Sequence, residues 1–129
     1  MPIFVVHTNV CRDNVPVELL SEATAKLAEA MELPVKYFAI NIVADQLMTF
    51  GGTTAPCAHC SLNSIGSFSE EKNLQYSKLL CGLLKKHLGI SPDRMYVDFF
   101  DMEPQNVAWD NKTFKVLIDA KNAKTLNEK

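Results

Sequence analysis

Apolar and polar positions alternate along the chain in a way that divides most of it into two units with the same plan. Each unit opens with a short apolar run, continues with apolar residues at helical spacing, and ends with a second apolar run after a proline. The expected strands cover residues 3–6, 37–43, 58–65 and 95–100, and the expected helices cover residues 15–32 and 70–88.

Local signals define the ends of both expected helices. Asn14 is a good N-cap for the first helix, Pro16 is acceptable in its first turn, and Pro34 ends it. Ser69 is expected to cap the second helix, and Gly89 is expected to close it. Each helix therefore has a predicted beginning and a predicted end.

The two β-α-β units predict an α+β fold with one four-stranded mixed sheet and two helices on one face. A weak internal similarity supports the repeat, because Pro34 and Lys36 before the second strand match Pro92 and Arg94 before the fourth. Helices on one face leave the other face and the strand edges open, and an open edge can pair with another chain. We therefore expect a closed oligomer.

Composition limits the class of protein further. The chain has 129 residues, of which 47% are hydrophobic and 22% charged, which is typical of one globular domain. The net charge of −2 and the spread of lysines and arginines predict no nucleic-acid partner. No apolar run approaches the roughly 20 residues of a membrane span, and no secretory signal opens the chain, so we expect cytosolic synthesis without membrane insertion.

The amino terminus offers the first candidate for chemistry. Initiator methionine is normally removed before a small residue, proline included, so we expect the mature chain to begin at Pro2 with a free secondary amine. An α-amino group has an ordinary pKa of about 7.7–8.0. Burial lowers the pKa of such a cation toward the range of a general base at neutral pH. On this stretch alone, a simple strand-edge proline is the favoured interpretation.

Four cysteines are expected to be free thiols: Cys11, Cys57, Cys60 and Cys81. Cys57 and Cys60 form a C-x-x-C motif, the spacing of thiol-disulfide exchangers and of half of many zinc sites. Residues three apart in a strand point to opposite faces, and a second ligand pair is missing. We therefore predict packing cysteines and no metal site, and keep a minor redox role for Cys57 and Cys60 as an alternative.

Three residues of the last long strand, Tyr96, Asp98 and Phe100, alternate and therefore share one face. A mixture of polar and aromatic groups is typical of a pocket wall, in which a few polar groups orient a ligand among aromatic rings. A solvated outer face with two aromatic rings explains the same pattern equally well. Trp109, the single tryptophan, predicts by itself only a packing residue.

Several separate motifs occur together in a recognisable order. Pro2 opens an apolar strand, and the further motifs are Asp-Gln-Leu-Met-Thr-Phe-Gly-Gly at 45–52, Cys-Ala-His-Cys at 57–60, Ser-Ile-Gly at 64–66, Tyr-Ser-Lys-Leu-Leu at 76–80 and Ser-Pro-Asp-Arg at 91–94. With these motifs, residues 2–114 closely resemble the macrophage migration inhibitory factor family of the tautomerase superfamily. The resemblance reverses the simpler interpretation of Pro2.

The resemblance implies a homotrimer with a tautomerase-like fold, in which a single domain, residues 1–114, completes the sheets of its neighbours and active sites lie between subunits. It implies keto-enol tautomerase activity on phenylpyruvate-like acids and dopachrome-like compounds, without a cofactor. It also implies an extracellular cytokine role with a cell-surface receptor as partner. A protein of this kind is cytoplasmic and is secreted by a route without a signal peptide. The alternative is a receptor-binding cytokine with weak or vestigial catalysis.

The resemblance also implies roles for particular residues. Pro2 would be the catalytic base, and Arg12 and Asp45 would form a receptor-binding pair that imitates a chemokine motif. Tyr96 and Asp98 would reach the site from the adjacent subunit. The full set of substrate-binding residues implied by the resemblance is Ile3, Tyr37, Ile65, Tyr96, Asp98, Val107, Trp109 and Phe114.

Two departures from the family pattern concern substrate binding. Leu33 stands where well-known members have a lysine for the substrate carboxylate, and Asp98 stands where they have an asparagine. The loss of a cation and the gain of an anion should weaken the binding of an anionic keto acid. Asn63 in place of a histidine and Phe100 in place of a tyrosine are lesser changes.

The C-terminal extension, residues 115–129, exceeds the usual family length. Its four lysines and two acidic residues give it a net charge of +2. The apolar run at 116–118 predicts a short added strand or an anchor, and the polar remainder predicts a mobile end. Two alternatives stay open for the extension: it covers the active site, or it has no role there.

Overall fold

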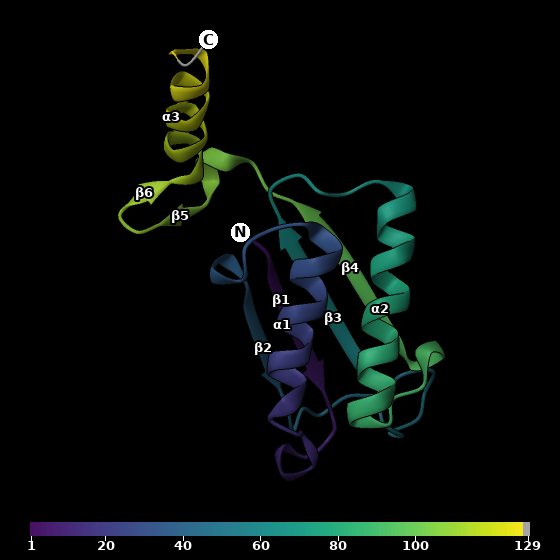
Figure 1. Ribbon diagram of the computed structural model, residues 1–129. Helices are drawn as coiled ribbons and strands as arrows, with labels where there is room; N and C mark the ends of the chain where they lie inside the picture. Colours follow the sequence, from purple (N-terminus) through teal and green to yellow (C-terminus); the bar gives the residue numbers. More distant parts are fainter. Residues whose placement is uncertain (128–129) are drawn as a thin grey trace.

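A computed structural model describes residues 1–127 and shows one four-stranded mixed sheet with both main helices on the same face (Figure 1). The predicted α+β fold is confirmed. The strands lie in the order β2-β1-β3-β4. In chain order, the elements of this body are β1 (Ile3–Thr8), α1 (Glu18–Met31), β2 (Ala39–Val43), β3 (Ala58–Ser64), α2 (Glu70–Leu88) and β4 (Met95–Asp101).

Strand directions follow from the two-unit plan. Within each unit the strands on either side of the helix are parallel, β1 with β2 and β3 with β4. The units join where β1 and β3 pair antiparallel, with Ile3 opposite Asn63. Because β1 has a partner on each side, the residues just before it are held at a fixed place at one end of the sheet.

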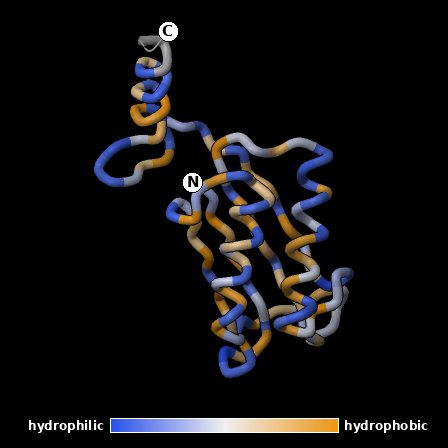
Figure 2. The backbone as a smooth tube through the Cα atoms, viewed as in Figure 1, coloured by the Kyte–Doolittle hydropathy of each residue, from blue (hydrophilic) through white to orange (hydrophobic). Residues whose placement is uncertain are grey.

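The hydrophobic core fills the space between the sheet and the two helices. Alternate residues of the central strands point into it, including Phe4 and Leu62, which are 1% and 0% exposed. Apolar residues recur on the inner faces of both helices, and Figure 2 shows hydrophobic segments in the strands with hydrophilic stretches in the connecting loops. A one-residue slip of β1 would turn its apolar side chains out of the core, so this packing fixes the register.

The capping predictions for α2 are confirmed. The Lys72 backbone N–H donates to Ser69 Oγ over 3.1 Å, so Ser69 satisfies one of the free donors of the first turn. Gly89 ends the helix in the left-handed conformation with φ of 68°, which glycine adopts without steric cost.

The prediction that Asn14 caps the first helix is wrong. Arg12–Asn14 forms a separate 3-10 turn, in which the Asn14 N–H donates to the Cys11 carbonyl over 2.9 Å. α1 begins at Glu18, after Val17, without a side-chain cap. The turn already uses the Asn14 backbone, so the helix starts three residues later than the expected residue 15.

The second expected strand is shorter than predicted. Val35–Tyr37 forms a 3-10 turn, closed by the Phe38 N–H donating to the Val35 carbonyl over 3.1 Å, and β2 begins only at Ala39.

A small C-terminal unit extends from the sheet at the end where β1 begins (Figure 1). It contains a two-stranded hairpin, β5 (Ala108–Trp109) and β6 (Lys112–Thr113), followed by α3 (Phe114–Asn127). Of the two alternatives for 116–118, an added strand or an anchor, the strand is wrong, and the polar remainder expected as a mobile end is helical as far as Asn127. This stretch is helical, supported by an ion pair one turn apart between Lys115 and Asp119 at 3.0 Å. The expected mobile end includes residues 128–129, which lie outside the described residues.

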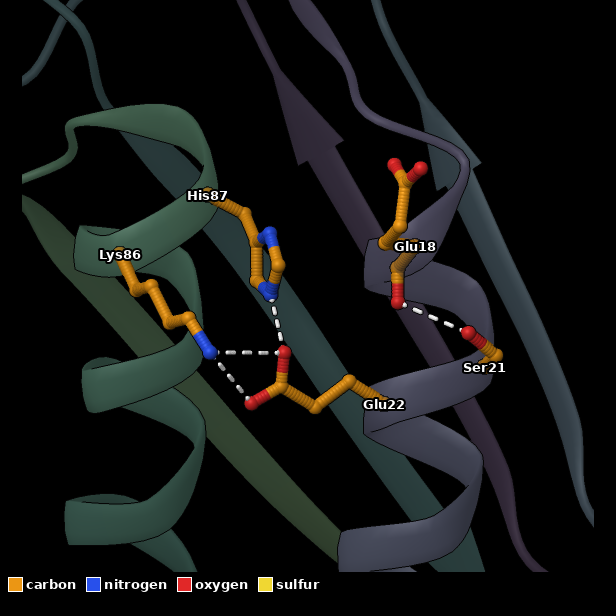
Figure 3. A network of polar contacts seen from close by, with 5 residues as sticks. All are labelled: Glu18, Ser21, Glu22, Lys86 and His87. Atoms are coloured by element: carbon orange, nitrogen blue, oxygen red, sulfur yellow. Dashed lines mark hydrogen bonds and ion pairs between the residues drawn. The ribbon is translucent and has the colours of Figure 1, made fainter.

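A polar contact links α1 to α2 beside the apolar core (Figure 3). The Glu22 carboxylate lies 2.9 Å from Lys86 Nζ and 2.5 Å from His87 Nε2. The His87 side chain is only 10% exposed. The hydrogen bonds from Lys86 and then from His87 hold the pKa of Glu22 below its ordinary value of 4.5.

We predict that Glu22→Gln destabilises the protein at neutral pH and that the deficit disappears in acid. A carboxyl whose folded-state pKa is lowered stabilises the fold above its unfolded pKa of 4.5, and this contribution is lost as pH falls through the lowered value. Urea unfolding of both proteins at pH 7 and pH 3, at one protein concentration, measures the difference. Glu18→Gln is the control, since the Glu18 carboxylate is not joined to Lys86 or His87 in Figure 3. An equal deficit at both pH values would contradict the prediction.

Candidate active site

A pocket of about 490 Å³ lies beside the amino terminus. The segment after α1 with its 3-10 turn, the residue following β3 and one side of α3 contribute its walls. Its lining residues are Met1, Leu33, Pro34, Lys36, Tyr37, Ile65, Phe114, Leu117, Ile118 and Lys121. The lining is mostly apolar, with two lysines.

Strand pairing positions Pro2 next to this pocket. The Ala39 N–H donates to the Pro2 carbonyl over 3.0 Å, so the contact between β1 and β2 extends one residue beyond β1. The Pro2 side chain is less than 2% exposed. Burial also lowers the pKa of the Met1 amino group from its ordinary value of 8.0. The surroundings of the Met1 amino group therefore shift its equilibrium toward the neutral amine.

Three aromatic rings pack together beside the pocket. The Tyr37 ring meets Trp109 edge-on with centroids 5.4 Å apart, and meets Phe114 in the same way at 5.9 Å. The Phe114 N–H donates to the Val107 carbonyl over 2.9 Å, which fastens the start of α3 to the segment before β5. Of the expected site residues, Tyr37, Ile65 and Phe114 line the pocket together with Met1. Trp109 and Val107 contact Tyr37 or Phe114 and do not line it, and Ile3 follows Pro2 in β1.

Two of the expected site residues lie elsewhere in the single chain. Tyr96 and Asp98 belong to the edge strand β4, with β3 between it and β1. In the sheet register Asp98 is level with Val5, and Tyr96 is level with His7, toward the far end of β1. Neither lines the pocket of its own chain. Phe50 packs on the Tyr96 ring with centroids 4.9 Å apart.

Asp98 has a partner that the sequence pattern did not identify. His59 Nε2 lies 2.8 Å from Asp98 Oδ2 on the sheet face that carries no helix. Both residues occupy outward positions of adjacent strands, but only the register of β3 against β4 brings them together. The acidic group of this strand thus has a histidine beside it.

The C-terminal helix supplies pocket residues that the sequence analysis did not assign. Leu117, Ile118 and Lys121 line the pocket together with Phe114. A signal was present in the sequence, because positions 114, 117, 118 and 121 have the spacing of one helix face.

The receptor-binding pair implied by the resemblance also comes together in space. The backbone N–H of Arg12, not its guanidinium group, donates to Asp45 Oδ1 over 3.3 Å. Both residues line a second pocket, of about 510 Å³, between the start of α1 and the outer edge of β2.

The C-x-x-C cysteines belong to the packed interior. Cys57 and Cys60 are 0% and 1% exposed. Burial raises the pKa of the Cys60 thiol to about 12, so the thiolate needed for disulfide exchange is almost absent at neutral pH. These observations favour packing over the redox alternative.

Residues 1–127 contain neither a cluster of metal ligands nor a membrane-spanning helix. No group of three or more His, Cys, Asp or Glu side chains is arranged to hold a metal ion. No helix in this part of the chain is long and apolar enough to cross a membrane.

The fold and the pocket define an α+β protein of two β-α-β units with a mostly apolar site at the start of a central strand. The sequence profile of one family, described as macrophage migration inhibitory factor (MIF), matches residues 1–115. The chain belongs to this family.

Individual relatives agree with this assignment. The macrophage migration inhibitory factor of Rattus norvegicus is 54% identical over 114 residues, which cover 88% of this chain and 99% of the relative. The structure of the Trichinella spiralis factor has a TM-score of 0.84 at 36% identity, covering 87% of this chain and 99% of that one. A homologue from Prochlorococcus marinus has a TM-score of 0.81 at 32% identity, covering 87% and 98%.

The family match leaves most of α3 unaccounted for. It ends at residue 115, whereas the helix continues to Asn127. The pocket therefore combines walls from the family domain with a wall from an additional helix.

Proposed function

We propose that this protein is a cofactor-independent keto-enol tautomerase in which Pro2 acts as the general base after removal of Met1. The observation that supports it most strongly is the burial of Pro2 beside a mostly apolar pocket, since burial disfavours the ammonium form of an amine at this position. A base must be uncharged to accept a proton, and a lowered pKa leaves more of the amine uncharged at neutral pH. Family membership adds to this argument.

The proposed reaction moves one proton within the substrate and needs no oxidant or reductant. The Pro2 nitrogen accepts a proton from the carbon next to the carbonyl, and the electron pair of that C–H bond forms a C=C bond. The carbonyl π pair moves to oxygen and gives an enolate. The proton then passes from the Pro2 ammonium to this oxygen, so the base is regenerated.

The lining of the pocket suits an aromatic 2-keto acid. Tyr37 and Phe114 offer apolar ring surface. The Lys36 ammonium, which lies 5.1 Å from the centre of the Tyr37 ring, brings a positive charge to the same wall. It is suited to bind the substrate carboxylate, the role that the resemblance places at Leu33.

A homotrimer completes the proposed site. The outer edge of β2 is unpaired in the single chain, and apolar side chains beside it are exposed, including Val17 at 76% and Leu20 at 39%. Tyr96 is 65% exposed on the uncovered sheet face. Pairing at open edges would cover these surfaces and bring Tyr96 and Asp98 to the pocket of a neighbour. The site is then incomplete in one chain alone.

A second candidate function, receptor binding as a cytokine, is supported by the contact between Arg12 and Asp45. The sequence separates these residues by more than thirty positions, and the fold places them side by side at an exposed end of the molecule. Catalysis and receptor binding use different residues, so both functions are compatible in one chain.

Pro2→Gly is expected to reduce kcat/KM for phenylpyruvate tautomerisation by at least about 100-fold, the usual contribution of a positioned general base. The pH profile of the wild-type enzyme, with its proline start verified by mass, should show a base that titrates below the ordinary range of about 7.7–8.0 for a terminal amine, because burial disfavours the ammonium form. Protein that retains Met1 is a matched control and should be inactive too. Circular dichroism and sedimentation must show an unchanged fold and assembly. Full turnover by the glycine variant would refute the proposal.

Asp98→Asn is expected to raise kcat/KM for phenylpyruvate about tenfold, mainly through KM. The reason is that a carboxylate at the neighbour's pocket repels an anionic substrate. His59→Gln should act in the opposite direction, since it removes the partner 2.8 Å from this carboxylate. The methyl ester of phenylpyruvate is the control substrate and should respond to neither change. Equal effects on the acid and the ester would show that charge is not the cause.

For receptor binding, Arg12→Ala and Asp45→Asn are expected to weaken the binding of fluorescently labelled protein to chemokine-receptor-bearing leukocytes about tenfold. Asparagine keeps the left-handed backbone of Asp45, where φ is 59°, and removes only the charge. Asp13→Asn, at an exposed position next to Arg12, is the control. Binding that is insensitive to Arg12 and Asp45 but lost in Pro2→Gly would contradict this role.

A further inference from the structure

One face of α3 forms a wall of the pocket at the amino terminus. The pocket-lining residues of the helix are Phe114, Leu117, Ile118 and Lys121, which follow each other at intervals of three, one and three. This spacing places them on a single face, while Val116 belongs to a different side and is 53% exposed. The helix thus turns a defined face toward the pocket.

The α3 wall is mostly apolar, like the wall formed by the segment that follows α1. Leu117 and Ile118 join Leu33 and Pro34 in lining the pocket, so both the segment that follows α1 and the first turns of α3 contribute apolar surface. None of the lining residues in this described chain is acidic. The pocket therefore suits a ligand with an apolar body and a negative charge.

The wall is also incompletely covered. Ile118 is 38% exposed, and Leu117 is half-buried. A ligand that fills the pocket would cover apolar surface on both side chains, and the removal of this surface from water would stabilise the bound state. Side chains in this position discriminate between ligands by size, since a larger apolar group must fit between them and the rest of the lining.

We propose that α3 is a specificity-determining wall of this pocket, with Leu117 and Ile118 limiting the size of the aromatic group of the 2-keto acid that enters. The proposal rests on the tautomerase function proposed above. It goes beyond it by assigning substrate selection to the helix that continues past the family match at residue 115. The core domain supplies the base, and the added helix sets which substrate reaches it.

The test compares two aromatic 2-keto acids in the full-length protein. Leu117→Ala and Ile118→Ala should each raise the ratio of kcat/KM for indole-3-pyruvate over that for phenylpyruvate about tenfold, the discrimination expected for a change of a few methylene groups in an apolar pocket. Leu117→Phe should lower the ratio. Alanine favours helix, so these alanine variants keep α3. Val116→Ala, on the same helix outside the pocket, should leave the ratio within about twofold.

Binding of unreactive analogues separates this proposal from the proposed catalysis. The affinities of 3-phenylpropanoate and 3-(1-naphthyl)propanoate, measured by calorimetry, should shift in the same direction as the turnover ratio. Suppose that the wild-type protein shows no turnover, but Leu117→Ala and Ile118→Ala still raise the affinity for the naphthyl compound relative to the phenyl compound. The size-limiting role of α3 is then supported, and the tautomerase proposal fails. The proposed role of α3 is refuted if the wild-type protein turns over substrate but Leu117→Ala and Ile118→Ala change neither the kcat/KM ratio nor the affinity ratio. It is also refuted if Val116→Ala changes the kcat/KM ratio as much as they do. If neither acid binds the wild-type protein, the wall is refuted as well.

Discussion

The pairing of β1 on both sides, together with the burial of its inner face, is the constraint on which the rest of the structure depends. Phe4 and Val6 are buried beneath the helices, and β2 and β3 bind the two edges of the strand. A strand held in this way cannot shift by one residue without exposing its apolar side chains. Pro2 immediately precedes it and is therefore held at a fixed position, as a positioned base requires.

Besides its fixed position, the amino-terminal region has apolar surroundings, and desolvation affects the protonation of an amine placed there. The burial of Pro2 disfavours an ammonium ion at this position, and Lys36 brings a positive charge to the lining of the adjacent pocket. Asp98 has the opposite sign, and His59 lies 2.8 Å from its carboxylate. The proposed base therefore depends on the burial of Pro2, and the proposed effect of charge at position 98 depends on the assembly that would bring Asp98 to a neighbour's pocket.

The C-terminal helix shows how a pocket can change without a change in the core. α3 begins at Phe114, whose ring packs on Tyr37, so its first turn is anchored to the family domain. Once the start is anchored, helical periodicity alone determines that Leu117 and Ile118 face the same side. Additional residues at the end of the chain therefore extend the existing wall and leave the packing of α1 and α2 on the sheet as it is.

Local and periodic features were readable from the sequence by itself: the two β-α-β units, the Ser69 cap, the Gly89 stop and the apolar strand after Pro2. These depend on neighbouring residues or on a repeat of fixed spacing. The Asn14 cap was wrong because a local turn competed for the same backbone, and the tail was helical where a short apolar run had predicted a strand. The contact of His59 with Asp98, and the meeting of α3 with the amino terminus, depend on strand register and on how distant segments pack. Only the tertiary structure decides such contacts, because no local pattern contains the distance between two elements far apart in the chain.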